Sequence, residues 1–292
     1  IPLRLVGSEM CIRDRNKRGS IMNQNVEHLL ITKFRKQLWR PFSKAIRDYE
    51  LVSENDKIAI CISGGKDSFI LAKLMQELQR HGNKHFDLVF LCMNPGYEPH
   101  ILKQIEENAK LLEIPIQIYK SDIFDVSLKL NEHHPCYMCA RMRRGFLYQK
   151  AKELGCNKIA LGHHFNDVIE TIMLSILYGG EYKSMPPKLK STNFSDMELI
   201  RPLYLIKEED IIKFRDYNDL SFINCACKFT KEKSSDSKRL KIKDLIKKLK
   251  KDNPNIEYNI FKSSENVNIE TLLGYKKKNE KHSFLENYNK NC

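Results

Sequence analysis

The sequence predicts an α/β protein in which helices cover both faces of a doubly wound parallel sheet. Two observations lead to this prediction. Short apolar runs of the length of buried strands alternate along the chain with longer segments of helical periodicity. In addition, the first apolar run ends in a loop containing serine and glycine that leads directly into a helix. Sheets of this class bind their ligands at such a position.

The first elements are an arm and a helix. Residues 1–21 show no periodicity and no capping signal, and they resemble translated sequencing-adapter read-through, so we expect a non-native or disordered arm with Met22 as the start. Residues 22–50 are expected to contain a helix over 27–48 with one apolar face. Its other face is basic and suits contact with a polyanion. The basic residues of interest here are Lys33, Arg35, Lys36 and Arg40.

Alternating strands and helices follow, and we expect residues 51–227 to form one domain. The expected strands are 57–62, 86–92, 114–119 and 158–161, and the expected helices are 67–80, 100–112, 138–154, 166–178 and 210–219. Parallel strands need such crossover helices. The stretch 184–201, which contains two consecutive prolines and is largely polar, is expected to be a loop.

Residues 228–292 are expected to form a basic extension. Lysine and arginine dominate 228–251, where leucine and isoleucine recur at helical spacing, so part of this stretch is predicted to be helical. The last forty residues are rich in asparagine and lysine and are expected to be weakly ordered.

The composition limits the partners and the compartment. The chain has 292 residues and a net charge of +13, which favours nucleic acid or an anionic membrane surface as partner. No apolar run approaches the ~20 residues of a membrane span. Nine cysteines without a secretory signal argue against a disulfide framework, and the cytoplasm is the expected location.

The loop Ser63-Gly-Gly-Lys-Asp-Ser68 predicts a phosphate site. Backbone N–H groups at a helix N-terminus bind anions, the serines add hydroxyl donors and Lys66 adds a cation. The loop is not a Walker A motif, because Ile60 and Asp67 occupy positions where that motif has glycine and a hydroxyl residue.

The cysteines leave several metal or redox sites open. Cys136-x-x-Cys139 precedes the cluster Arg141-Met-Arg-Arg144, and Cys225-Ala-Cys227 follows much later. These patterns suit a redox pair, a zinc site completed by the later cysteines or by His133 or His134, or an iron–sulfur cluster. The remaining cysteines of the predicted domain, which lie in apolar or isolated contexts, are interpreted as core residues: Cys61, Cys92 and Cys156.

In combination, these motifs resemble a known family. The loop is similar to the pyrophosphate loop of the PP-loop ATPases, and residues 31–251 resemble the tRNA 2-thiocytidine biosynthesis family, an iron–sulfur branch of those enzymes. The further blocks that carry the resemblance are Leu161-Gly-His-His-x-x-Asp167, Tyr178-Gly-Gly180, Met185-Pro-Pro-Lys-Leu189, Ile200-Arg-Pro-Leu203 and the late Phe-Ile-x-Cys225. One departure is Asn166, where the family has the first of two aspartates.

The resemblance implies a fold of the adenine nucleotide α-hydrolase type and an ATP-dependent tRNA sulfurtransferase. Such an enzyme adenylates the 2-oxygen of a cytidine in the anticodon loop, replaces it with sulfur, and releases AMP and pyrophosphate. It implies ATP, Mg²⁺ and a [4Fe–4S] cluster as cofactors. The implied partners are tRNA and a sulfur donor such as a cysteine desulfurase system, and a homodimer is compatible with the sequence.

The expected site residues fall into four groups. The catalytic residues are Asp67, Cys136 and Cys139. The ATP-binding residues are Ser63, Gly64, Gly65, Lys66, Asp67, Ser68, His163 and Asp167. The cluster ligands are Cys136, Cys139 and Cys225, with Cys227 as the alternative third ligand. The RNA-binding residues are Lys33, Arg35, Lys36, Arg40, Arg143 and Arg144.

Two other functions remain open at this point. One is a PP-loop enzyme of another class, such as lysidine synthesis or amide formation, in which the cysteines hold a structural zinc. The other is an RNA-binding protein without catalysis, which Asn166 favours because a carboxylate of the family pattern is missing there.

Overall fold

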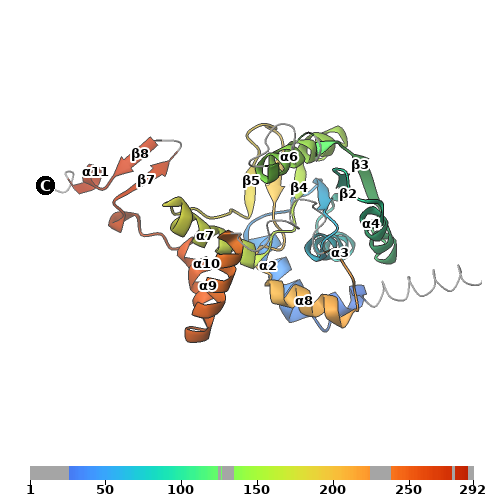
Figure 1. Ribbon diagram of the computed structural model, residues 1–292, viewed down its shortest axis with the longest axis horizontal. Helices are drawn as coiled ribbons and strands as arrows, with labels where there is room; N and C mark the ends of the chain where they lie inside the picture. The colour runs from blue at the N-terminus through green and yellow to red at the C-terminus, as the bar shows by residue number, and fades with distance from the viewer. Residues whose placement is uncertain (1–25, 124–125, 127–134, 224–237, 278–279, 289–292) are drawn as a thin grey trace, which may run out of the picture. The chain divides into compact units, whose positions relative to one another are not determined.

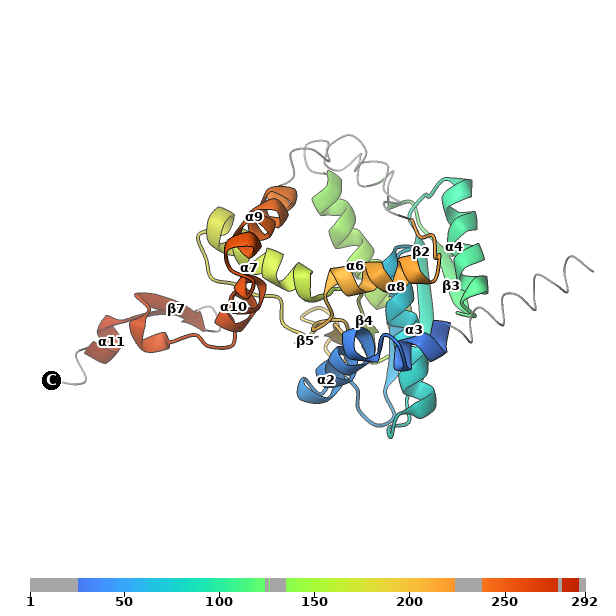
Figure 2. The same ribbon diagram turned by 90° about the horizontal axis from the view of Figure 1, so that it is seen from below.

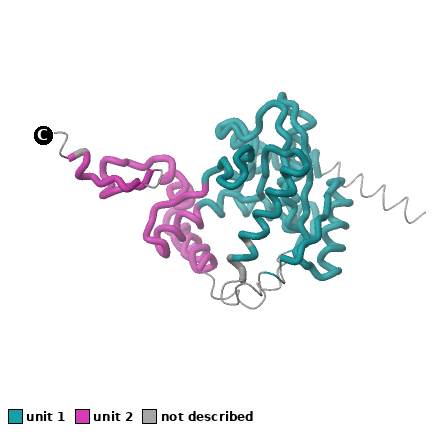
Figure 3. Tube along the Cα trace, turned by 90° about the horizontal axis from the view of Figure 1, so that it is seen from above, with its two compact units in different colours: residues 1–168, 186–237 teal, residues 169–185, 238–292 magenta. Residues whose placement is uncertain are grey.

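The computed structural model describes residues 26–123, 126, 135–223, 238–277 and 280–288. Cys225, Cys227 and the two histidines at 133 and 134 lie outside the described residues, as does the expected arm over 1–21. The chain divides into two compact units, one comprising residues 1–168 and 186–237 and the other 169–185 and 238–292 (Figure 3).

The first unit is built on a six-stranded sheet in the order β3-β2-β1-β4-β6-β5 (Figure 1). The strands are β1 (Lys57–Ile62), β2 (Asp87–Asn94), β3 (Ile116–Lys120), β4 (Lys158–Ala160), β5 (Lys188–Lys190) and β6 (Glu198–Ile200). All neighbouring strands pair in parallel except β5, which is antiparallel to β6. The predicted mostly parallel sheet is therefore confirmed, with one antiparallel edge strand.

The prediction of a loop over 184–201 was wrong, because this stretch contains β5 and β6. Each of these strands has only three residues, too few to show an alternating pattern in the sequence. Their pairing is set by the rest of the sheet, since β6 adds in parallel to β4.

Helices cover both faces of the sheet (Figures 1 and 2). They are α3 (Lys66–His81), α4 (Pro99–Leu111), α6 (Pro135–Glu153) and α8 (Glu208–Tyr217), whereas α7 (Phe165–Gly179) begins in this unit and continues into the second. Ala59 and Cys61 of β1 pack in one cluster with Tyr148 and Ala151 of α6. Because side chains alternate along a strand, the other residues of β1 face the opposite layer, where α3 packs. The sheet is thus doubly wound.

The cysteines expected in the core are buried there. Cys61, Cys92 and Cys156 are all below one-tenth exposed, which confirms that interpretation. Burial raises the pKa of Cys61 and of Cys92 to about 12. These thiols stay protonated at neutral pH and behave as small apolar side chains.

The helix predicted over 27–48 is interrupted. A helical segment over 26–31 is followed by a turn, a π-helix η1 (Arg35–Trp39) and then α2 (Arg40–Asp48). Phe34 packs edge-on against Phe214 of α8, with ring centroids 5.1 Å apart, and the Lys33 ammonium lies 3.5 Å from the centre of the Tyr217 ring. The π-turn widens the helix where these aromatic contacts form.

A buried ion pair fastens the start of this segment to α3. Lys73 is 1% exposed, and its ammonium lies 2.5 Å from a carboxylate oxygen of Glu27 and 2.9 Å from the carbonyl of Leu112. Arg80 holds the other carboxylate oxygen of Glu27 at 2.6 Å. A lysine buried this deeply is stable only when it is paired, so the pair fixes the position of residues 26–31.

The second unit contains the basic segment. Its elements are the later part of α7, α9 (Lys238–Asp252), α10 (Ile256–Ser263), η4 (Ile269–Thr271), the antiparallel hairpin β7 (Gly274–Lys277) and β8 (Glu280–Ser283), and α11 (Leu285–Tyr288). Arg239 of α9 lies 2.7 Å from the buried carboxylate of Glu170 on α7. Regular elements thus occur where weak order was expected. None of the helices among the described residues is long and apolar enough to cross a membrane.

Glu27→Gln should lower the free energy of unfolding by about 3 kcal/mol at pH 7, because it leaves the Lys73 ammonium buried without its counter-charge. Burial raises the pKa of Glu27, but the bonds from Lys73 and Arg80 outweigh it, so the folded-state pKa lies below 4.5. The carboxylate therefore contributes fully above pH 4.5, and this contribution is lost as the pH falls through the folded-state pKa. Urea unfolding of both proteins between pH 7 and pH 3 measures it.

Two controls accompany that measurement. Glu54→Gln removes an exposed carboxylate and should change the stability little. The double variant with Lys73→Met should recover part of the loss, because it removes the unpaired charge. A constant difference between wild type and Glu27→Gln over the whole pH range would contradict the assignment to an ion pair.

Candidate functional site

The loop at residues 63–68 is closed by its own serines. The Ser68 hydroxyl, which is buried, donates to the carbonyl of Gly65 at 2.9 Å and accepts from the backbone N–H of Ser63 at 3.2 Å. The Ser63 hydroxyl lies 3.3 Å from that of Ser68. Ser68 therefore shapes the loop, whereas Ser63 is exposed and available to a ligand.

Gly64 is required by the shape of this loop. Its φ angle of +89° is in the region that side chains rarely adopt, and a Cβ atom there would lie 2.9 Å from Ile105 of α4. Gly65 then caps α3, which begins at Lys66. The backbone N–H groups at this helix start are free of intrahelical partners and suit a phosphate.

The turn after β4 lies against the same helix start. A Cβ atom on Gly162 would lie 3.1 Å from the carbonyl carbon of Asp67 and 3.2 Å from the nitrogen of Ser68. Only glycine lets the two backbones approach this closely. β1 and β4 are neighbours at the point where the strand order reverses, so the two loops form the ligand site expected for this class of sheet.

His164 joins the two loops. It is 5% exposed; its Nε2 lies 4.0 Å from Oδ1 of Asp67 and its Nδ1 lies 3.5 Å from Oδ2 of Asp167. Asp167 also accepts the backbone N–H of His164 at 2.9 Å. His163, which was the expected ATP contact, is half-buried in the same turn. The structure therefore brings Asp67, Asp167 and both histidines together.

Glu208, at the start of α8, completes the group. The Lys66 ammonium lies 3.1 Å from Asp67 and 3.2 Å from Glu208, and all three side chains are less than one-third exposed. The backbone N–H of Glu208 donates to the side-chain oxygen of Asn166 at 2.9 Å. Asn166 thus supports α8, and through Glu208 it helps to position Lys66.

Arg201 follows β6 and is a buried cation near the same edge. It is 8% exposed, and one guanidinium nitrogen donates to the carbonyl of Pro186. Burial lowers the pKa of Arg201 to about 10, while Tyr204, Tyr148 and Asp167 partly offset this effect. The block Ile200-Arg-Pro-Leu203 thus adds positive charge within electrostatic reach of Asp167.

The first turn of α6 carries the paired cysteines. Cys139 is 4% exposed, whereas the side chain of Cys136 is outside the described residues. Arg143, one turn further, is half-buried and donates to the Tyr97 hydroxyl at 3.4 Å. Arg143 is within electrostatic reach of Cys61 and Cys92, so it faces the sheet rather than only solvent. Arg144 is exposed.

The chain that leads to the later cysteines passes the phosphate loop. Ile223, two residues before Cys225, donates its backbone N–H to the carbonyl of Gly64 at 3.3 Å. The ring of Phe222 stacks on Phe69 of α3, with centroids 5.3 Å apart. Positions 225 and 227 themselves are not described.

The basic residues of the N-terminal segment are all exposed. Arg35, Lys36 and Arg40 project from η1 and the start of α2, while Lys33 is held over the ring of Tyr217. Lys36 and Arg40 are therefore the freest of this group to contact a polyanion.

Parts of the donor set suit the expected cofactors. The Oδ1 atom of Asp67 is buried and accepts no hydrogen bond from the described residues, which suits a Mg²⁺ ion shared with bound phosphates. The part of the chain that the structure describes holds no group of three histidine, cysteine or carboxylate side chains arranged for a metal. For a cluster, Cys139 is followed one helical turn later by Arg143, a spacing that suits a thiolate ligand compensated by positive charge.

The chain is similar to known proteins over most of its length. Residues 31–232 match the model of the PP-loop domain family. The chain is 37% identical over 243 residues to a tRNA-cytidine(32) 2-sulfurtransferase of Alcanivorax borkumensis, covering 81% of this chain and 83% of the relative. It is 34% identical over 266 residues to the enzyme of the same name from Paraburkholderia phymatum, covering 89% and 77%.

Among solved structures, the U34-tRNA thiolase NcsA from Methanococcus maripaludis, determined with its [4Fe–4S] cluster, matches with a TM-score of 0.61. The match covers 77% of this chain and 76% of that protein at 23% identity, and it supports the fold. The phosphate loop and the turn after β4 agree with these matches. The chain therefore belongs to the tRNA-cytidine(32) 2-sulfurtransferase family of PP-loop proteins.

Proposed function

We propose that the protein is an ATP-dependent tRNA sulfurtransferase that converts cytidine 32 of tRNA to 2-thiocytidine. The relatives that share most of its length bear the name of this activity. The observation that carries the proposal in this chain is the meeting of the loop at 63–68 with the His164 turn, which brings a phosphate cradle and two carboxylates to one edge of the sheet.

The first half of the reaction activates the base. The 2-oxygen of the cytidine attacks the α-phosphorus of ATP, the bond to the β-phosphate breaks, and pyrophosphate leaves. Gly65 and Lys66 would hold the phosphates at the start of α3, while Glu208 keeps the Lys66 ammonium in place. Asp67, with its buried Oδ1, would hold Mg²⁺ against the phosphates.

The second half replaces oxygen by sulfur. A sulfur nucleophile attacks C2 of the activated base, and AMP departs with the original oxygen. A [4Fe–4S] cluster held by Cys136, Cys139 and Cys225 would supply the sulfur, with Cys227 as the alternative third ligand. The hydrogen bond from Ile223 to Gly64 holds Ile223 beside the phosphate loop, and Cys225 follows two residues later in the sequence, which supports the pairing of the two half-reactions.

The proposed partners are a tRNA and a sulfur donor. The net charge of +13 and the exposed Lys36 and Arg40 suit the phosphate backbone of tRNA, and Arg144 adds a further exposed cation. Lys33 and Arg35 belong to the same N-terminal segment, and the half-buried Arg143 of α6 is proposed to contribute together with Arg144. We propose a cysteine desulfurase system as sulfur donor, and a homodimer as a compatible assembly.

Asp67→Ala should abolish adenylation, because the loop loses the carboxylate that faces both Lys66 and His164. tRNA nucleosides should be measured by mass spectrometry from cells that lack this activity and carry wild type or variant. Wild type should restore 2-thiocytidine and Asp67→Ala should not. The matched control is Asp87→Asn, which changes an exposed carboxylate at the start of β2, away from the strand ends that carry the site. Normal AMP release by purified Asp67→Ala would refute the role.

Cys139→Ser should lose the cluster and keep the fold, because serine is close to cysteine in size and Cys139 is not part of the side-chain cluster around Ala59 and Cys61. Anaerobically purified wild type is expected to be brown with about four irons per chain. The variant should be colourless, with an unchanged far-UV spectrum and melting temperature. Cys156→Ala, in the core, should retain the colour. A colourless wild type with one zinc would favour a structural metal site instead.

The double charge reversal Lys36→Glu with Arg40→Glu should weaken tRNA binding and flatten its salt dependence. For each phosphate that the variant no longer neutralises, the slope of log K against log salt should fall by roughly 0.7–0.9. The control reverses two exposed lysines of α4, Lys103 and Lys110. Equal effects of the two double variants would indicate only a change in net charge, and the RNA surface would then lie elsewhere, with α9 as the next segment to test.

A further inference from the structure

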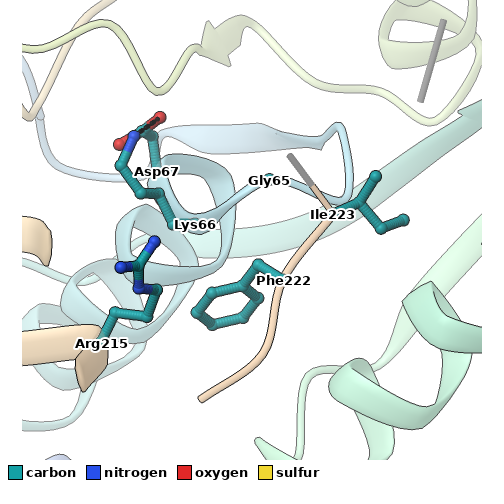
Figure 4. A pocket seen from close by; sticks show the side chains of 6 residues that line it. All are labelled: Gly65, Lys66, Asp67, Arg215, Phe222 and Ile223. Carbon is teal, nitrogen blue, oxygen red and sulfur yellow. Dashed lines mark hydrogen bonds and ion pairs between the residues drawn. The ribbon is translucent and has the colours of Figure 1, made fainter. Parts of the chain in front are cut away.

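A small cavity borders the phosphate loop on its α8 side, separate from the His164 turn. It has a volume of about 80 Å³ (Figure 4). Three of its residues come from the loop and the start of α3, one from the last turn of α8, and two from the chain that follows α8: Gly65, Lys66, Asp67, Arg215, Phe222 and Ile223. The sequence pointed to the loop but not to Arg215.

Contacts with neighbouring elements fix the residues that line one side of this cavity. Phe222 stacks nearly parallel to Phe69, with 21° between the rings, and cannot turn into the space without breaking that contact. Ile223 is tied to Gly64 by its backbone N–H, and Ser221 accepts a hydrogen bond from the Asn108 amide at 2.9 Å. The cavity is therefore a fixed feature of the loop's surroundings.

One of the two cations that line the cavity has hydrogen-bond donors to spare. The Lys66 ammonium already faces two carboxylates, Asp67 and Glu208, so its charge is matched. Arg215 is different, because its only acceptor among the described residues is the neighbouring Asp216, which is 58% exposed. That contact uses Nε and Nη2, at 2.7 Å and 2.6 Å, and leaves the donors on Nη1 for a ligand. Figure 4 shows the guanidinium directed toward Lys66.

Its size selects the kind of anion. About 80 Å³ holds several water molecules or one tetrahedral oxyanion, but it is well below the roughly 300–1,000 Å³ of sites that enclose whole organic ligands. A guanidinium matches the oxygen spacing of a phosphate and binds it through two parallel hydrogen bonds. A base or a ribose would be too large for the cavity and has no negative charge to pair with Arg215.

We propose that Arg215 binds the terminal phosphate of ATP and, after the α–β bond has broken, the pyrophosphate. This rests on the proposed function, in which ATP is bound by the loop and split there. Arg215 would distinguish a triphosphate from AMP, because only the triphosphate reaches the cavity. The α-phosphate and the nucleoside stay on the His164 side of the loop.

Equilibrium binding of MgATP, magnesium pyrophosphate and AMP tests this proposal without tRNA or turnover. Arg215→Gln should weaken binding of MgATP and of pyrophosphate by about tenfold to a hundredfold, as expected when a charged hydrogen bond is removed. Its affinity for AMP should stay within twofold of wild type. The matched control is Lys213→Gln, which removes an exposed cation from the same helix and should leave all three affinities unchanged.

Three results would overturn the proposal. One is wild-type affinity of Arg215→Gln for pyrophosphate, and another is an equal loss of affinity for AMP. If Arg215→Gln has a lower melting temperature than wild type, Arg215→Lys is measured in its place. The third contradicting result is a ratio of ATP affinity to AMP affinity in Arg215→Lys that equals the wild-type ratio. Failure of the wild type to bind ATP would overturn the proposed function as well. Correct nucleotide selectivity without tRNA thiolation would overturn only the proposed function.

Discussion

The candidate site depends on one ion-paired lysine. Lys66 begins α3, and its ammonium bridges the carboxylate of Asp67, on the same turn, and that of Glu208, on α8. Glu208 is in turn held by Asn166, at the start of α7. Two segments that are far away in the sequence, α8 and the start of α7, are therefore tied to the phosphate loop through one cation. A lysine held by two carboxylate neighbours is ordered before any nucleotide arrives.

The second constraint is the distance between two backbones. Gly162 allows the end of β4 to lie within van der Waals distance of the first turn of α3. This approach brings His164 between Asp67 and Asp167, and it makes the site a property of two adjacent strand ends. The chemistry of the loop is general to nucleotide binding, and the neighbouring turn adds His164 and the partly buried Asp167.

The sequence predicted those parts of the fold that rest on local patterns. The bounds of β1 agree with the prediction at both ends, because a continuous apolar run is followed at once by the glycine loop. β5 and β6 escaped prediction because three-residue strands carry no period. The Lys66–Glu208 pair joins residues 142 positions apart, and no local pattern marks such a partner. The sequence presented Asn166 as a missing carboxylate, whereas its side chain supports a helix.

The buried pair between Glu27 and Lys73 has a consequence for the limits of the folded unit. Lys73 belongs to the helix that carries the phosphate loop, yet its counter-ion lies in a segment outside the sheet. Any shortened version of the protein that keeps the sheet must therefore keep residues 26–31, although the matched PP-loop domain begins only at residue 31. The part of the chain needed for a stable fold therefore begins before the first residue matched by the PP-loop domain family.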